Sequence, residues 1–439
     1  MNEPVNIFWF RRDLRLDDNC GLYKALSGTL KVLPVFVFDS DILNKLENKT
    51  DGRVHFIHKE LQKLKTELEK KGSSLVVIHN TADEAFKILE KTYSIKSVFV
   101  NSDYEPQGIE RDERVKQFLN EKGITFFSFK DMVIFEKYEV VKDDNTPYQV
   151  FTSYAKKWKE RLHFHPIDFY PSEKLLDNLY QMQALSLPSL SEIGFKNSSF
   201  YFPEKTIILN TIKNYESSRD FPSLHGTSKL SVHLRLGTIS IRKLVSSVLA
   251  VSEKYLTELI WREFYQTVLF HFPYVVNSAF KKEYNAIKWD NNEDIFYLWC
   301  KGETGFPIVD AGMRELNATG YMHNRVRMIV AGFLTKNLSI DWRWGEAYFA
   351  EKLLDFELAS NNGGWQWAAG CGVDAAPYFR VFNPVLQAQK FDADNAYIKK
   401  WVPEYSSNSY VKPIVDYKTS KQQTIEKYKQ TLNKNLIVE

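Results

Sequence analysis

Residues 6–19 read NIFWFRRDLRLDDN, a short apolar and aromatic run that ends at a dense group of arginines and aspartates. Four similar runs follow before residue 130: KVLPVFVF (31–38), SLVVIH (74–79), SVFVN (97–101) and ITFFSF (124–129). Runs of this length and composition are typical of buried strands. The amphipathic stretches between them end at Gly72 and Gly123, and glycine is the usual residue at the end of a helix. The alternation predicts a Rossmann-like α/β domain with a parallel sheet over residues 1–131.

The turn after the first run does not carry the glycine pattern of a dinucleotide-binding domain. That pattern, Gly-x-Gly-x-x-Gly, lets the backbone approach a pyrophosphate at the start of a helix. RRDLRLDDN stands in its place. We therefore expect a nucleotide cofactor to bind elsewhere in the chain.

Beyond this domain the sequence changes character twice. Residues 132–202 lose periodicity and collect Pro, Asn and Ser, which predicts an interdomain linker on the surface. From residue 203 on, apolar residues recur at helical spacing in TIILNTIKNYESSR (206–219), YLTELIWREFYQTVLF (255–270), NRVRMIVAGFLTKNL (324–338) and GEAYFAEKLLDFEL (345–358). The sequence thus predicts an all-α domain over residues 203–439.

The composition fits a globular protein of two domains. The chain has 439 residues, 44% of them hydrophobic and 26% charged, with 10 Trp, 23 Tyr and 31 Phe. So many rings suit either a ring-shaped ligand or ordinary core packing. The net charge is +3, and the positive excess lies beyond residue 150, which permits an anionic partner there without requiring one.

The cysteines and the N-terminus predict a cytoplasmic protein. Cys20, Cys300 and Cys371 lie far apart and form no paired motif, so neither a disulfide framework nor a thiolate metal site is expected. The first residues do not read as a secretory signal, and no stretch is apolar enough to cross a membrane. We therefore expect a reducing compartment and no membrane partner.

Residues 355–372, DFELASNNGGWQWAAGCG, hold two amides and two glycines ahead of two tryptophans. By itself NNGG predicts a tight turn that ends a helix over DFELAS, with the indoles in the core. Two stretches upstream carry further polar and aromatic residues. MHNRVRM (322–328) places Asn324 and Met328 one helical turn apart, and ELIWREFY (258–265) does the same for Glu258 and Trp261. These side chains could line one polar and aromatic cavity or serve as separate capping and solvated positions.

Together these stretches resemble the photolyase/cryptochrome family, and most closely its bacterial class I cyclobutane pyrimidine dimer photolyases. The resemblance spans nearly the whole chain, in FWFRRDLRLDDN (8–19), GTSKLSVHLRLGTIS (226–240), ELIWREFY (258–265), TGFPIVDAGMRELNATGYMHNRVRM (304–328) and DFELASNNGGWQWAAGCGVDAAPYFRVFNP (355–384). It implies a helical domain that binds FAD and no metal.

The resemblance also implies which residues hold FAD. They are Tyr215, Thr227, Ser228, Lys229, Leu230, Ser231, Tyr255, Arg327, Asp355, Glu357 and Asn361. Asn361 would face flavin N5, where plant-type cryptochromes carry an aspartate that donates a proton. A neutral amide there favours the reduced anionic flavin that repair requires. The sequence departs from common family residues at Tyr255, Lys229 and Glu357, and each departure keeps the chemical character.

The implied substrate is a pyrimidine dimer flipped out of DNA, a step for which photolyases are themselves a standard example. The residues at the lesion and the DNA would be Glu258, Trp261, Arg262, Asn324, Arg325, Met328, Trp367 and Gln387. Trp261 would stack on the dimer, Glu258 would stabilise its radical anion, and Asn324 would hydrogen-bond it. Members that repair (6-4) photoproducts carry histidines at the positions of Asn324 and Met328. Their replacement here favours cyclobutane dimers.

Trp289, Trp342 and Trp365 match the tryptophan chain that reduces the flavin in light, although the sequence alone does not separate them from core indoles. A second, antenna chromophore is also typical of the family. Residues 104–113, YEPQGIERDE, lack the Asn-Glu pair that binds folate, so a folate is disfavoured. A deazaflavin, another flavin or an empty site remain as alternatives.

The implied activity is that of a deoxyribodipyrimidine photo-lyase, which splits dimers by electron transfer from excited, reduced FAD. Two alternatives are a blue-light photoreceptor of the cryptochrome type and a flavin electron-transfer protein without DNA. For the repair enzyme we expect a monomer in the cytoplasm that associates with the nucleoid when it is bound to DNA.

Overall fold

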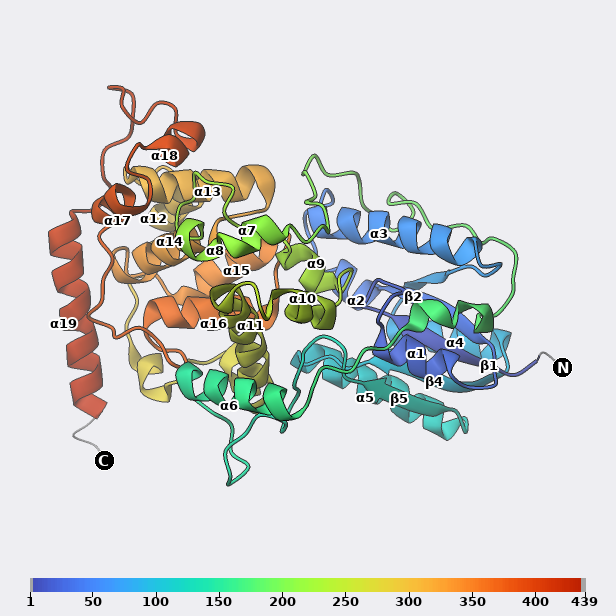
Figure 1. The fold of residues 1–439 in the computed structure, drawn as a ribbon. Helices are drawn as coiled ribbons and strands as arrows, with labels where there is room; N and C mark the ends of the chain where they lie inside the picture. The colour runs from blue at the N-terminus through green and yellow to red at the C-terminus, as the bar shows by residue number, and fades with distance from the viewer. Residues whose placement is uncertain (1–2, 436–439) are drawn as a thin grey trace. The chain divides into compact units, whose positions relative to one another are not determined.

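The computed structural model describes residues 3–435 and divides them into two compact units (Figure 1). The first unit comprises the chain up to Val140, Trp158–Ile207 and Lys229–Leu249. The second comprises Val141–Lys157, Ile208–Ser228 and the chain from Ala250 on. The units interleave along the sequence, whereas the prediction divides it into three consecutive ranges.

A five-stranded parallel sheet forms the centre of the first unit, with strand order β3-β2-β1-β4-β5 (Figure 1). The strands are β1 (Val5–Phe10), β2 (Val32–Asp39), β3 (Val76–Asn80), β4 (Ile95–Asn101) and β5 (Thr125–Phe129). The helices between them are α1 (Cys20–Leu26), α2 (Ser40–Leu43), α3 (Gly52–Glu69), α4 (Ala82–Thr92) and α5 (Pro106–Glu121). All five predicted strands are confirmed, as is the α/β class of this domain.

The side chains of β1 alternate between the two faces of the sheet, and each face is covered by helices. Phe8 and Phe10 pack with residues of α1 and α3, whereas Ile7 and Trp9 pack with residues of α4 and α5. Gly72 and Gly123 adopt the left-handed conformation after α3 and α5, as predicted.

The start of α1 is closed by side chains of the unit itself. The first amides of this helix donate to Asp131 (3.1 Å, from Cys20), Asn101 (2.8 Å, from Gly21) and Asn19 (3.1 Å, from Leu22). In a dinucleotide-binding domain these amides would face a pyrophosphate. Their internal partners agree with the missing glycine pattern.

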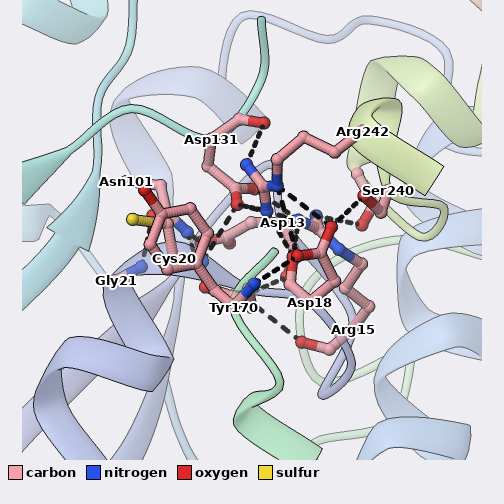
Figure 2. A network of polar contacts seen from close by, with 12 residues as sticks. Asp13, Arg15, Asp18, Cys20, Gly21, Asn101, Asp131, Tyr170, Ser240 and Arg242 are labelled. Atoms are coloured by element: carbon pink, nitrogen blue, oxygen red, sulfur yellow. Dashed lines mark hydrogen bonds and ion pairs between the residues drawn. The ribbon is translucent and has the colours of Figure 1, made fainter. Parts of the chain in front are cut away.

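A buried group of ion pairs joins this region to a later part of the chain (Figure 2). Arg15 and Arg242 both pair with Asp131 at 2.7 Å, and Arg242 also pairs with Asp18 at 3.0 Å. Both aspartates are 1% exposed. Arg242 lies in α10 (Ile241–Val248), which follows α9 (Ser231–Leu236), and this pairing explains why residues 229–249 belong to the first unit.

The predicted linker is more structured than its composition indicates. It contains the helix α6 (Phe151–Phe164) and two short 3-10 turns, Ser172–Lys174 and Leu176–Asn178. Leu176, Leu179 and Phe195 are buried in the core on the α3 side of the sheet. This segment therefore packs as part of a domain and is not a surface connection along its whole length.

The second unit is helical, and the predicted all-α class is confirmed. Its helices are α7 (Leu209–Lys213), α8 (Tyr215–Ser218), α11 (Glu253–His271), α12 (Glu293–Lys301), α13 (Pro307–Thr319), α14 (Asn324–Lys336), α15 (Trp342–Lys352), α16 (Leu358–Ala369), α17 (Pro384–Phe391), α18 (Ala396–Trp401) and α19 (Tyr417–Asn435). Two 3-10 turns, Pro273–Val276 and Lys282–Ala286, follow α11.

Two helix boundaries differ from the prediction. The stretch GEAYFAEKLLDFEL is not one helix, because α15 ends at Lys352 and the Leu354 amide then bonds to the carbonyl of Gly320. NNGG is not a turn, because α16 continues through it to Ala369.

Candidate functional site

The helix α16 lies in the middle of the second unit and packs against α11, α14 and α15. Gly363, the first glycine of NNGG, allows the close approach of α11, since a Cβ there would lie 2.2 Å from Cδ1 of Tyr265. The glycine thus serves helix packing and not a turn. This packing brings together α11, α14 and α16, which carry half of the predicted site residues.

Hydroxyl groups gather at the start of α11. Ser228 Oγ lies 2.8 Å from the hydroxyl of Tyr255, and Thr227 Oγ1 lies 3.2 Å from that of Tyr321. The rings of Tyr215 and Tyr255 meet edge to face at 5.0 Å. Burial raises the pKa of Tyr255 and of Tyr321, so both stay neutral and able to donate. Four predicted FAD contacts thus come together, and Tyr321 joins them without having been predicted.

The rest of the predicted phosphate loop belongs to the first unit. Lys229 has a positive φ of 53° and is exposed, Leu230 is buried, and Ser231 is the exposed first residue of α9.

Arg327 and Asp355, both predicted FAD contacts, form an ion pair. The guanidinium NH2 lies 2.9 and 3.1 Å from the two carboxylate oxygens, and Nε donates to the carbonyl of Met322 at 2.8 Å. Burial alone would lower the pKa of Arg327, but the Asp355 carboxylate outweighs it and raises the pKa. The pair is a fixed cation beside a fixed anion.

Glu357 is buried and receives hydrogen bonds from two helices. Arg262 donates to Oε1 at 2.9 Å and Gln266 at 3.0 Å, both from α11, and Ser360 donates to Oε2 at 3.0 Å. The Arg262 side chain is only 12% exposed. Its position therefore indicates a role in holding Glu357 more than one in contacting DNA phosphates.

Glu258 and Arg325 are each held by an ion pair that the sequence did not predict. Glu258 pairs with Arg219, whose guanidinium also lies 5.2 Å from the ring of Tyr215. Arg325 pairs with Asp220 at 2.7 Å. Arg219 stands four residues after Tyr215, a helical spacing that was the available signal for it.

Trp261 has one aromatic face covered. Its ring stacks on Phe151 at 3.6 Å and 7°. Phe151 comes from the stretch predicted as linker, so no local signal indicated the contact. Asn324 is the exposed first residue of α14, and Met328 lies half-buried one turn later.

The other two predicted DNA contacts lie on α16 and α17. Trp367 is half-buried, with its ring 6.5 Å from that of Phe382, and Gln387 is half-buried in the first turns of α17.

The three tryptophans of the expected electron-transfer chain belong to one core cluster. Trp365 packs edge to face against Phe349 at 5.0 Å, and the Arg343 guanidinium lies 4.7 Å from the ring of Trp342. Trp289 is partly exposed and meets the Tyr428 ring at 6.2 Å.

The donor set of these helices fits FAD. Some buried polar atoms on these helices have no hydrogen-bond partner within the described residues, and a buried group of that kind indicates a missing ligand or water. They include Gln266 Oε1 on α11, Arg325 Nε on α14, Trp365 Nε1 on α16 and His323 Nε2 just before α14. Neutral hydroxyls, a fixed arginine and an unpaired amide oxygen suit phosphates and a heteroaromatic ring.

Metal ligands, membrane spans and free thiols are the other candidate features of the described residues. In that part of the chain no three His, Cys, Asp or Glu side chains are grouped to hold a metal ion. No helix between residues 3 and 435 is long and apolar enough to cross a membrane. Cys20, Cys300 and Cys371 are buried free thiols, and burial raises the pKa of Cys300 and Cys371 to about 12.

Comparison with known proteins assigns this arrangement. Residues 6–172 match the DNA photolyase family model, and residues 255–409 match the FAD binding domain of DNA photolyase. The chain belongs to the DNA photolyase family. Among curated relatives of this family, a deoxyribodipyrimidine photo-lyase of Halobacterium salinarum is 37% identical, covering 91% of this chain and 89% of its own. That of Vibrio cholerae is 36% identical, covering 97% and 99%.

Solved structures agree. A bacterial class III photolyase from Agrobacterium tumefaciens has a TM-score of 0.86 at 31% identity, over 98% of both chains. An archaeal photolyase from Sulfolobus tokodaii, solved with two FAD molecules, has a TM-score of 0.84 at 34% identity, over 97% of this chain and 100% of its own. A cryptochrome from Synechocystis has a TM-score of 0.84 at 25% identity, over 97% and 99%. The predicted family and both fold classes are confirmed.

Proposed function

We propose that this photolyase-family chain repairs DNA in light by splitting cyclobutane pyrimidine dimers. The observation that carries the proposal is the group on α11 and α14. Trp261 offers a flat ring backed by Phe151, and beside it in α11 Glu258 is fixed by Arg219. Asn324 and Met328 add neutral contacts one turn apart. Such a set suits a neutral, ring-shaped lesion lifted out of a duplex.

FAD bound by the helical unit supplies the electron that repair requires. Tyr215, Thr227, Ser228 and Tyr255 provide hydroxyls for its polar groups, and Lys229, Leu230 and Ser231 continue the same loop in sequence. Arg327, Asp355 and Glu357 give fixed charges, and Asn361 would face the flavin ring. Trp289, Trp342 and Trp365 conduct electrons to the site from the surface.

The lesion itself is handled by the residues on α11 and α14. Trp261 stacks on the flipped dimer, and Asn324 holds it by a hydrogen bond. Glu258, once protonated, can donate a hydrogen bond or its proton to the negative charge that develops on the dimer, and a donor placed in this way stabilises a transition state. Arg325, Trp367 and Gln387 contact the DNA around the lesion. Asn324 and Met328 carry no titrating group, so (6-4) photoproducts are not substrates.

The proposal extends to the setting of the enzyme. We take it to act as a monomer on DNA, in the cytoplasm and at the nucleoid. A second chromophore, of the flavin or deazaflavin type, is an option because the Sulfolobus tokodaii photolyase was solved with two FAD molecules. The similarity to a cryptochrome keeps a blue-light receptor as the second candidate.

Product analysis tests the proposal. The purified protein is reduced, mixed with oligonucleotides that carry one cyclobutane dimer or one (6-4) photoproduct, and given equal doses of blue light. Chromatography of the digested DNA should show restored thymines from the dimer alone, and none in the dark. Repair of neither lesion would favour the receptor, and repair of the (6-4) product alone would refute the assigned lesion.

A further inference from the structure

The side-chain amide of Asn361 is held by a partner that no motif pointed to. Its nitrogen donates twice to Glu346 on α15, to the backbone carbonyl at 3.0 Å and to Oε1 at 2.8 Å. Within residues 3–435 no group donates a hydrogen bond to Asn361 Oδ1. An amide has two hydrogens on nitrogen, so Glu346 can engage both of them and leave only the oxygen for a ligand.

We propose that Glu346 is a positioning residue that fixes this amide with its nitrogen toward α15 and its oxygen toward bound FAD. The inference rests on the proposed function, in which Asn361 lies against the flavin ring. It adds a residue outside the set that the family resemblance indicated.

The close approach of α15 and α16 makes the contact possible. A Cβ at Gly345 would lie 2.1 Å from Cη2 of Trp365, so only glycine fits there. The next residue is Glu346, and Asn361 lies one turn before Trp365 on α16. Burial raises the pKa of Glu346, and the hydrogen bond from Asn361 partly offsets that rise.

The orientation has a chemical consequence at flavin N5. Oxidised flavin has a lone pair on N5, which an amide oxygen repels and an amide nitrogen would stabilise. Reduced flavin carries a hydrogen on N5, which an amide oxygen accepts. An amide fixed with oxygen toward N5 therefore favours the reduced cofactor. An amide free to rotate would stabilise the oxidised cofactor as well.

Substitutions at residue 346 separate the effect of the Asn361 amide orientation from the effect of the charge of the Glu346 side chain. Glu346→Leu removes the side-chain acceptor and leaves the backbone carbonyl of residue 346 to hold one amide hydrogen, whereas Glu346→Gln keeps an oxygen at the same place and removes the carboxyl group. Glu351→Leu, on the same helix, is the matched control because Glu351 is exposed and its ion pair is with the neighbouring Lys352. The reduction midpoint potential of the bound flavin is measured for each variant between pH 6 and 9.

We expect Glu346→Leu to lower the ratio of reduced to oxidised flavin tenfold or more at a given potential, which is about 30 mV for a two-electron couple. Glu346→Gln and Glu351→Leu should match the wild type at every pH. An unchanged potential in Glu346→Leu would overturn the proposal. A rise in the midpoint potential of both Glu346→Leu and Glu346→Gln would also overturn the proposal. It would show that the charge of the carboxyl group, and not the orientation of the amide, sets the potential.

Two controls keep the result clear. Thermal unfolding of the flavin-free variants shows whether the fold is intact, and Glu346→Met is the second variant, read in the same way, if the leucine does not fold. Failure of the wild type to hold FAD or to split dimers would defeat the proposed function. An unchanged potential in a working enzyme would defeat only the role of Glu346.

Discussion

At the scale of the residue, the side chains of the site are held by partners from distant parts of the sequence. Glu258 depends on Arg219, Arg325 on Asp220, and Asn361 on Glu346. Each partner lies outside the helix that carries the residue it holds. A substitution at a partner therefore acts on the site without touching the substrate.

Trp261 offers a direct test of lesion binding. We expect Trp261→Ala to weaken the binding of dimer-containing DNA by about 1–3 kcal/mol, the usual loss of one base-to-aromatic stack. Trp261→Phe should lose less, because a ring still stacks against Phe151. Fluorescence anisotropy in the dark measures both. Equal affinities of all three proteins would place the lesion elsewhere.

We expect His323 to make the stability of the fold depend on pH. It is the N-cap residue before α14, and its Nδ1 accepts from the Arg325 amide at 3.2 Å. Burial, and after it the charge of Arg327, lowers the pKa of His323 to about 4. The unfolded chain binds a proton here near pH 6.5, so its contribution is complete above that pH and is lost as the pH falls toward 4. The full loss is about 3 kcal/mol.

His323→Asn keeps a capping oxygen and removes the titration. Urea unfolding of both proteins, at equal flavin content, follows stability between pH 7 and 4. The wild type should lose more stability than the variant over this range. Parallel curves would show that His323 is not the titrating group.

At the scale of the element, the two adjacent glycines of α16 have opposite surroundings. A Cβ at Gly363 would overlap the Tyr265 ring, while nothing lies within 4 Å of one at Gly364. We expect Gly363→Ala to destabilise the protein by about 1–3 kcal/mol through overpacking. Gly364→Ala should stabilise it by up to about 1 kcal/mol, because alanine favours a helix. Urea unfolding compares the two, and equal effects would refute the packing role.

The strands of the sheet and the helix α16 show which elements the sequence could predict and which it could not. Runs such as KVLPVFVF carry their strand signal in consecutive residues, and all five were predicted within two residues of their ends. NNGG was predicted as a turn because two glycines locally favour one. Packing against Tyr265 overrides that preference, and nothing near residue 363 in the sequence encodes it.

The candidate site likewise contains residues that the sequence could predict and residues that it could not. Pairs one turn apart on one helix, such as Asn324 and Met328, could be read from spacing. Spacing does not say which helices lie against one another, and only the family resemblance indicated that. Arg219 had a local signal in its spacing of four residues from Tyr215. Glu346 could not be predicted, since its role depends on which helices lie side by side.

At the scale of the whole molecule, the ion pairs of Figure 2 join residues far apart in the chain. We expect Arg242→Met to destabilise the protein by about 3–5 kcal/mol, because it leaves buried Asp18 and Asp131 short of a partner. Lys243→Met is the control. Its ion pair with Asp17 is more than 40% exposed on both sides, and such pairs contribute about 0–1 kcal/mol. Chemical denaturation distinguishes the two, and similar losses would refute the argument.

The position of Arg242 also bears on how the protein is made. A ribosome releases the sheet strands first, yet Arg242 follows Asp131 by 111 residues. Until that arginine emerges, a nascent chain that had already closed its sheet would bury two aspartates with only Arg15 beside them. The first unit therefore completes its fold only after two segments of the second unit, Val141–Lys157 and Ile208–Ser228, have already appeared. A fragment that stops near residue 200 should stay incompletely folded for the same reason, however intact its strands.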